Sequence, residues 1–147
     1  MTALIRKATD ADRQELVQTM CDADRQELTH LGITPAEALE TIDGSETFTV
    51  ELNQQVVAMF GIVQMKEGYG RIWMLSTDRT NRCKSLARTA RQFVNEQARK
   101  HKFLTNVVWS KNAAHLNWID WLGFHFMGVE TYNGQRFVRF GLMGAQT

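Results

Sequence analysis

Residues 69–109 read YGRIWMLSTDRTNRCKSLARTARQFVNEQARKHKFLTNVVW, and this stretch decides the fold. It begins with a β-rich run at 69–75 and ends with another at 103–109. Residues 82–101, between the two runs, carry apolar side chains at helical spacing. A connection from strand to helix to strand is right-handed and joins parallel strands. The sequence therefore predicts one parallel step within a β-sheet.

The segments that precede this unit predict antiparallel strands. Residues 47–52 alternate between apolar and polar side chains, and Asn53 and Gln54 separate them from a second run at 55–65. This second run is almost continuously apolar, which is typical of a central strand buried on both faces. We therefore expect 47–52, 55–65 and 69–75 to lie side by side.

The C-terminal part predicts a helix followed by a hairpin. Asn112 is a good residue to begin a helix, because its side chain accepts hydrogen bonds from free backbone N–H groups. The runs 124–132 and 136–142 flank Asn133 and Gly134, a pair that favours the tight turn of a β-hairpin. The expected fold class is α+β, with a mixed, mostly antiparallel sheet of about seven strands flanked by helices.

The N-terminal part predicts a short strand at 3–8 and two helices, at 10–31 and 36–42. The heptapeptide DADRQEL occurs twice in the first helix, at 10–16 and 22–28. The repeated carboxylates lack the glycine and the distal glutamate of a calcium-binding loop. We therefore interpret the two copies as solvated helix starts.

Composition restricts the class of protein. The chain has 147 residues, of which 44% are hydrophobic and 22% charged, values of a single globular domain that spans 1–147. Two cysteines and four scattered histidines show no metal-binding spacing. The sequence shows no secretory signal and no apolar run long enough to cross a membrane, so we expect a protein that is not secreted and binds no membrane.

The net charge of +1 hides an asymmetry. Residues 1–51 hold 4 Lys/Arg and 11 Asp/Glu, whereas residues 79–102 hold 8 Lys/Arg and one acidic residue, Glu96. The basic segment includes the start of the long helix, where free backbone N–H groups attract anions. This helix start is a candidate anion site. The tryptophans near the last helix are more typical of a core than of a nucleic-acid surface, so we expect no nucleic-acid partner.

The order of elements resembles the GNAT fold of acetyl-CoA-dependent N-acetyltransferases over nearly the whole chain. Asn112 stands at a helix start eleven residues before Gly123-Phe124, as it commonly does in GNAT proteins. The segment from Arg82 to Ala87 resembles the GNAT loop that holds the CoA pyrophosphate, although Ser85 stands where that loop has glycine.

Within that fold, the sequence looks like the small internal virion (core) proteins of T7-like podoviruses. The shared motifs are Leu31-Gly32-Ile33-Thr34-Pro35, Trp73-Met74-Leu75-Ser76-Thr77-Asp78, Arg82-x-x-Ser85-x-Ala87-Arg88, Asn106-x-Val108-Trp109 and Asn112-x-x-His115. The resemblance covers most of residues 28–142.

The resemblance implies a site for acetyl-CoA or CoA and no metal. The residues expected to bind it are Leu75, Arg82, Lys84, Ser85, Leu86, Ala87 and Asn112. GNAT enzymes often carry a tyrosine that acts as the general acid at the position held here by Ile119, so the sequence does not assign the catalytic residues. His115 and Tyr132 are the candidates, the first because histidine is a common general base in enzymes. For both residues, packing is the alternative interpretation.

Two functions follow from the resemblance. The first, which the substitutions at Ser85 and Ile119 favour, is a phage virion or assembly component with weak or no transferase activity. Its partners would be other phage virion proteins or a second copy of the chain, in the host cytoplasm or the virion. The alternative is an active acetyl-CoA-dependent N-acetyltransferase that acts on a small amine or a protein amino group.

Overall fold

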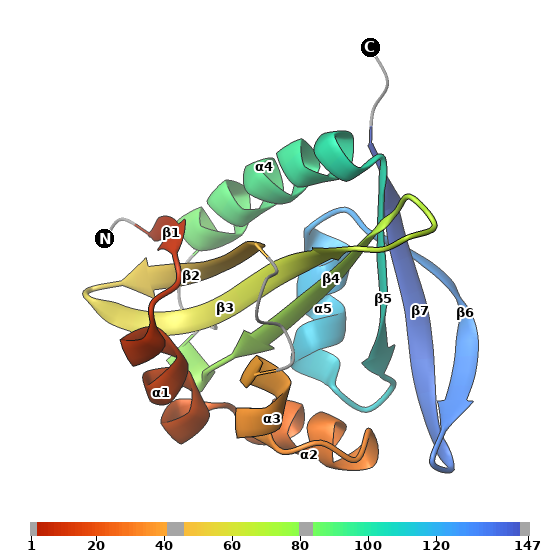
Figure 1. Cartoon of the computed structure of the whole chain (residues 1–147), viewed down its shortest axis with the longest axis horizontal. Helices are drawn as coiled ribbons and strands as arrows, with labels where there is room; N and C mark the ends of the chain where they lie inside the picture. The colour runs from red at the N-terminus through yellow and green to blue at the C-terminus, as the bar shows by residue number, and fades with distance from the viewer. Residues whose placement is uncertain (1–2, 41–45, 80–83, 145–147) are drawn as a thin grey trace.

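The structure, a computed structural model, describes residues 3–40, 46–79 and 84–144, except for the side chains of 84–87. These residues form one mixed sheet with the strand order β1-β2-β3-β4-β5-β7-β6 (Figure 1). The strands are β1 (Leu4–Lys7), β2 (Glu46–Leu52), β3 (Gln55–Gln64), β4 (Gly70–Ser76), β5 (Phe103–Trp109), β6 (His125–Tyr132) and β7 (Gln135–Met143). The helices are α1 (Asp10–Thr19), α2 (Asp22–His30), α3 (Pro35–Glu40), α4 (Lys84–His101) and α5 (Ala113–Trp121).

The topology confirms the predicted α+β class. Among the described strand pairs, β4 and β5 are parallel and the others antiparallel, so the helical crossover lies where the sequence places it. β3 is buried along most of its length, as expected of a central strand. The turn between β6 and β7 has φ of 49° at Asn133 and 76° at Gly134, which fits the tight hairpin turn.

The expectation of one helix over residues 10–31 is wrong. The chain leaves helical geometry at Met20, with φ −54° and ψ 137°, and a second helix begins at Asp22. Met20 forms an isolated bridge with Thr77, and the N–H of Cys21 donates to the carbonyl of Ser76 at 2.9 Å. The break is therefore imposed by the end of β4, and no glycine or proline marks it in the sequence.

Apolar side chains pack on both faces of the sheet. One cluster joins the sheet to α4 and α5, and it includes Ile72 and Ile119. Another joins the sheet to α1, α2 and α3, and it includes Leu16 and Leu75. Side chains of a strand alternate between faces, so β4 contributes to both clusters.

The sheet opens between its two parallel strands. β4 and β5 pair at Gly70–Leu104 and Arg71–Thr105, and beyond these pairs the strands diverge. Figure 1 shows the two strands spreading toward the end of the sheet where α2 and α3 lie. β5 keeps its other partner, β7, over its whole length. An edge of β4 is thus left without a neighbouring strand in the middle of the sheet.

No helix in the described part of the chain is both long enough and apolar enough to span a membrane.

Candidate functional site

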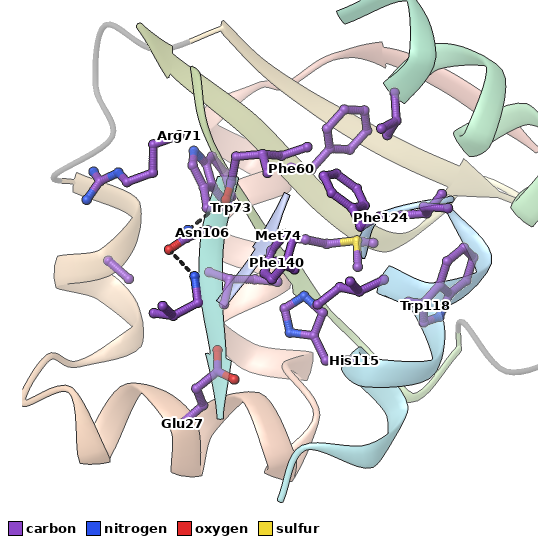
Figure 2. Close-up of a pocket in the computed structure, with 18 of the residues that line it drawn as sticks. Glu27, Phe60, Arg71, Trp73, Met74, Asn106, His115, Trp118, Phe124 and Phe140 are labelled. Atoms are coloured by element: carbon purple, nitrogen blue, oxygen red, sulfur yellow. Dashed lines mark hydrogen bonds between the residues drawn. The ribbon is translucent and has the colours of Figure 1, made fainter. Parts of the chain in front are cut away.

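A cavity of about 220 Å³ occupies the opening between β4 and β5 (Figure 2). Its walls come from β3, β4, β5 and β7 and from helices on both faces of the sheet. Most of the lining is apolar, and polar groups are few. The polar or charged lining residues are Glu27, Arg71, Asn106 and His115, together with the tryptophans Trp73 and Trp118. An apolar cleft with a few convergent polar groups is typical of a small-molecule site.

Asn106 sits where the two strands begin to separate. Its side-chain amide donates to the carbonyl of Ile72 on β4 at 2.6 Å, and its side-chain oxygen accepts from the N–H of Val107 at 2.7 Å. The dashed lines in Figure 2 mark these bonds. The side chain thus bridges β4 and β5 at the closed end of the opening and fixes where it begins.

Backbone groups of β4 face the opening. The carbonyl of Ile72 bonds Asn106, and the N–H of Ser76 bonds a side chain of α2, so both residues direct their peptide groups away from β3. Peptide groups of an antiparallel strand alternate with a period of two residues. Met74 therefore presents its N–H and carbonyl to the opening, whereas those of Leu75 face β3.

The first copy of DADRQEL is an ion-paired structural element. Asp12 accepts hydrogen bonds from Arg6 at 2.7 and 3.0 Å and from Thr49 at 2.9 Å. The Arg6 guanidinium holds the pKa of the Asp12 carboxyl far below its ordinary value. Glu15 accepts from the N–H of Val56 at 2.8 Å and from Arg79 at 2.9 Å. Asp12 and Glu15 therefore each have an arginine partner.

The second copy lies against the ends of β4 and β5. Asp24 accepts from the N–H of Ser76 at 2.7 Å, from its hydroxyl at 3.0 Å and from the amide of Asn112 at 2.8 Å. Glu27 accepts from the N–H of Trp109 at 2.7 Å. The exposed fractions of Asp24 and Glu27 are 1% and 6%, and that of Asp12 in the first copy is 7%. Each copy begins a helix as expected, α1 at Asp10 and α2 at Asp22, but the expectation that the copies are solvated is wrong for these three carboxylates.

The buried carboxylates of the second copy have no arginine or lysine partner among the described residues. Their nearest basic group is His115, whose Nδ1 lies 3.8 Å from Asp24 Oδ1 and has no hydrogen-bond partner. Burial raises the pKa of Glu27 above its ordinary value, although His115 and the Trp109 N–H act in the opposite direction. Figure 2 shows Glu27 and His115 directed into the cavity from different helices.

The two predicted catalytic candidates lie in different places. His115 is in the first turn of α5, is 8% exposed and lines the cavity. Tyr132 lies at the end of β6 and does not line the cavity; it donates to Glu130 and packs edge-on against Phe137. The hydrogen bond to Glu130 raises the pKa of Tyr132. The structure thus brings only His115 to the opening.

The predicted cofactor residues are described in part. Asn112 begins α5 as expected, since its oxygen accepts from the N–H of His115 at 3.3 Å, and it is fully buried against Asp24. Leu75 is buried and lines the cavity. Arg82 lies outside the described residues, and Lys84, Ser85, Leu86 and Ala87 form the first turn of α4 with their side chains undescribed. Whether these residues bind a cofactor stays a prediction.

Asp24, Glu27, Met74 and Asn106 are not among the residues that the sequence predicts for the site. One signal for the first two was present, because an exact repeat of a heptapeptide with three acidic positions is unusual. No local pattern distinguishes Met74 or Asn106 from other strand residues, since their roles follow from the divergence of β4 and β5.

The solved structures that match the chain include acetyltransferases. A GNAT-family acetyltransferase from Bacillus anthracis superposes with a TM-score of 0.73 at 12% identity, over 97% of this chain and 95% of that one. Spermidine N-acetyltransferase from Vibrio cholerae, in complex with CoA and spermine, superposes with a TM-score of 0.65 at 13% identity, over 96% of this chain and 95% of that one. A Salmonella typhimurium protein solved with its cofactor acetyl-CoA superposes with a TM-score of 0.68 at 14% identity, over 100% of this chain and 96% of that one. No family model and no curated protein matches the sequence.

The chain therefore has the GNAT fold. The comparisons contradict the expectation of a phage virion component with weak or no transferase activity, because the matched structures reported above include acetyltransferases and proteins solved with CoA or acetyl-CoA. Among the described residues, no group of histidine, cysteine, aspartate or glutamate side chains is arranged to hold a metal ion.

Proposed function

We propose that the protein is an acetyl-CoA-dependent N-acetyltransferase and that the opening between β4 and β5 is its active site. The observation that carries the proposal is the opening itself: an apolar cavity of about 220 Å³ that runs along an unpaired edge of β4. Acetyl-CoA, when bound, would supply an acyl group activated as a thioester. The acceptor would be a small amine or a protein amino group.

The residues of the opening fit the acyl-carrying arm of CoA, which is an extended chain with amide groups. The N–H and carbonyl of Met74 face the opening and would pair with such an amide as a neighbouring strand does. The apolar walls, among them Val94 and Ile119, would pack against the methylene groups of the arm. We expect the strand around Leu75 to hold the arm, with Met74 making the backbone contacts.

The start of α4 fits the phosphate end of the cofactor. Lys84, Ser85, Leu86 and Ala87 form the first turn of a helix of 18 residues, and the free N–H groups of such a turn bind anions. Arg82 and Lys84 would add positive charge, as expected from the sequence. Asn112 caps α5 and bonds Asp24, and its predicted contact with the cofactor stays a prediction.

Titration calorimetry with acetyl-CoA tests the proposal. We expect saturable binding that Ser85→Glu weakens at least tenfold, because the added carboxylate would repel the phosphates. Ser85→Ala is the matched control and should bind within about threefold of the wild type. A second pair of variants tests the backbone contact. Met74→Pro removes the N–H that faces the opening, whereas Met74→Leu keeps it. Absence of binding at millimolar acetyl-CoA by a folded wild-type protein would refute the proposed function.

Three expectations stay predictions. These are the resemblance to core proteins of T7-like podoviruses, the location in a host cytoplasm or virion, and the association with other virion proteins or a second copy of the chain. The acetyltransferase proposal depends on none of them.

A further inference from the structure

We propose that Glu27 is the catalytic base that takes the proton from the acceptor amine. This inference rests on the proposed function and assigns a residue to its proton transfer. It follows from a comparison that the chain provides internally, because the heptapeptide DADRQEL occurs twice and folds into two different environments.

Both copies use their carboxylates in the same geometric way. In each, the glutamate accepts the backbone N–H of a strand residue: Glu15 binds that of Val56 at 2.8 Å, and Glu27 binds that of Trp109 at 2.7 Å. The copies differ in the charge of the groups that contact the glutamate. Glu15 also binds the guanidinium of Arg79, whereas Glu27 has no cationic partner of this kind among the described residues. The second copy therefore keeps a carboxylate that is free to exchange a proton.

Position selects Glu27 over Asp24. Asp24 has both oxygens occupied, by Ser76 and by Asn112, and it does not line the cavity. Glu27 lines the cavity, and the bonds that the structure gives it, from Trp109 and Asn112, both fall on Oε1. Oε2 thus has no donor within the described part of the chain. Asp24 is a positioning residue, because it orients Asn112, which in turn contacts Glu27.

The environment of Glu27 favours its protonated form more than water does. Burial raises the pKa of Glu27, and Asp24 acts in the same direction, whereas His115 lowers it. A base works best when its pKa approaches the working pH, and a buried carboxylate meets that condition better than an exposed one. The other charged group of the lining, Arg71, is exposed on β4.

The proton balance of the reaction is complete with one carboxylate. The ammonium form of the acceptor gives one proton to Glu27, which becomes a carboxylic acid. The free amine then forms a bond to the acyl carbon of the thioester, and the carbon–sulfur bond breaks. The second proton of the nitrogen balances the departing thiolate as a thiol, and Glu27 returns its proton to solvent.

The test compares Glu27→Gln with Glu15→Gln, the same substitution in the other copy of the heptapeptide. Both variants and the wild type are titrated with acetyl-CoA by calorimetry. Thiol release is then measured with butylamine, spermidine, a peptide with one free lysine and a peptide with a free N-terminal alanine. We expect Glu27→Gln to bind acetyl-CoA as the wild type does, and to lose about 10²–10⁴-fold in kcat/KM, the usual contribution of a general base. The kcat/KM of Glu15→Gln should stay within about threefold of the wild-type value.

The pH profile separates a base from a structural residue. Wild-type kcat/KM should rise with pH as Glu27 ionises, and this acidic limb should be absent from the residual activity of Glu27→Gln. An unchanged rate and pH profile in Glu27→Gln would overturn the assignment. It would also be overturned if the wild type binds acetyl-CoA but releases thiol with none of the four amines. Absence of acetyl-CoA binding by the wild type would instead refute the proposed function itself.

Discussion

Replacing Asp12 by asparagine should destabilise the protein by about 3 kcal/mol at pH 7. Asp12 is 7% exposed and binds Arg6 through two bonds, at 2.7 and 3.0 Å. Asparagine keeps the shape but loses the charge, and a hydrogen bond to a charged group contributes about 1.5–3 kcal/mol. The side chain of Arg6 is 33% exposed, so solvent screens part of this contribution. The amide group that replaces Oδ1 would face a donor of Arg6, and this unmade hydrogen bond adds about 1 kcal/mol.

Urea unfolding followed by circular dichroism measures this loss, and the midpoint of thermal unfolding should fall by about 6–12 °C, at about 2–4 °C per kcal/mol for a chain of this size. The control is Asp10→Asn on the same helix. Its carboxylate is 91% exposed and pairs with Arg13 at the surface, so its removal should cost less than about 0.5 kcal/mol.

The difference between wild type and Asp12→Asn should also depend on pH. The pKa of Asp12 is lowered in the folded protein, so its stabilisation is present above the ordinary aspartate pKa of about 3.9 and is lost as the pH falls through the folded value. The two proteins should therefore begin to converge in stability below about pH 4 and approach each other further as the pH falls toward the folded pKa. A loss under about 1 kcal/mol at pH 7, or a gap that persists unchanged at low pH, would refute the ion-pair reasoning.

Three further substitutions test the packing. Gly61→Ala should cost about 1–3 kcal/mol in urea unfolding, because a Cβ there would lie 2.5 Å from the Trp73 ring; a gain in stability would contradict this contact. Asn112→Ala should cost about 2–3 kcal/mol, since it removes the cap of α5 and leaves Oδ1 of Asp24 without its donor, and a thermal midpoint equal to that of the wild type would disprove it. Trp121→Gln, at a side chain 52% exposed, should change the unfolding free energy by less than about 0.5 kcal/mol, so a large effect would show an unrecognised contact.

Much of the fold could be predicted because its signals are local. The β5 strand has the bounds that the apolar run at 103–109 predicts, and the turn at Asn133 and Gly134 follows from residues that favour positive φ. The break between α1 and α2 could not be predicted in the same way. It depends on the contact of Met20 with Thr77, which lies far away in the sequence.

The site was harder to predict than the fold for the same physical reason. Asp24 and Glu27 look like surface carboxylates when only their neighbours in the sequence are considered. Their burial is decided by Ser76 and Trp109, at the ends of two strands that come later in the chain. Asn112 was predicted to begin a helix, because capping is local, but its bond to Asp24 joins residues 88 positions apart.

The short pairing of β4 with β5 has a mechanical consequence. The β-sheet consists of two leaves, β1 to β4 and β5 to β7, which are joined along the backbone only at Gly70 and Arg71 among the described residues. Within each leaf the strands pair over most of their length, so each leaf is stiff. Opening and closing of the sheet should therefore concentrate at this joint, where the fewest backbone hydrogen bonds resist it. A molecule wedged between the leaves would set the angle between them, and the two halves of the chain would move as units around it.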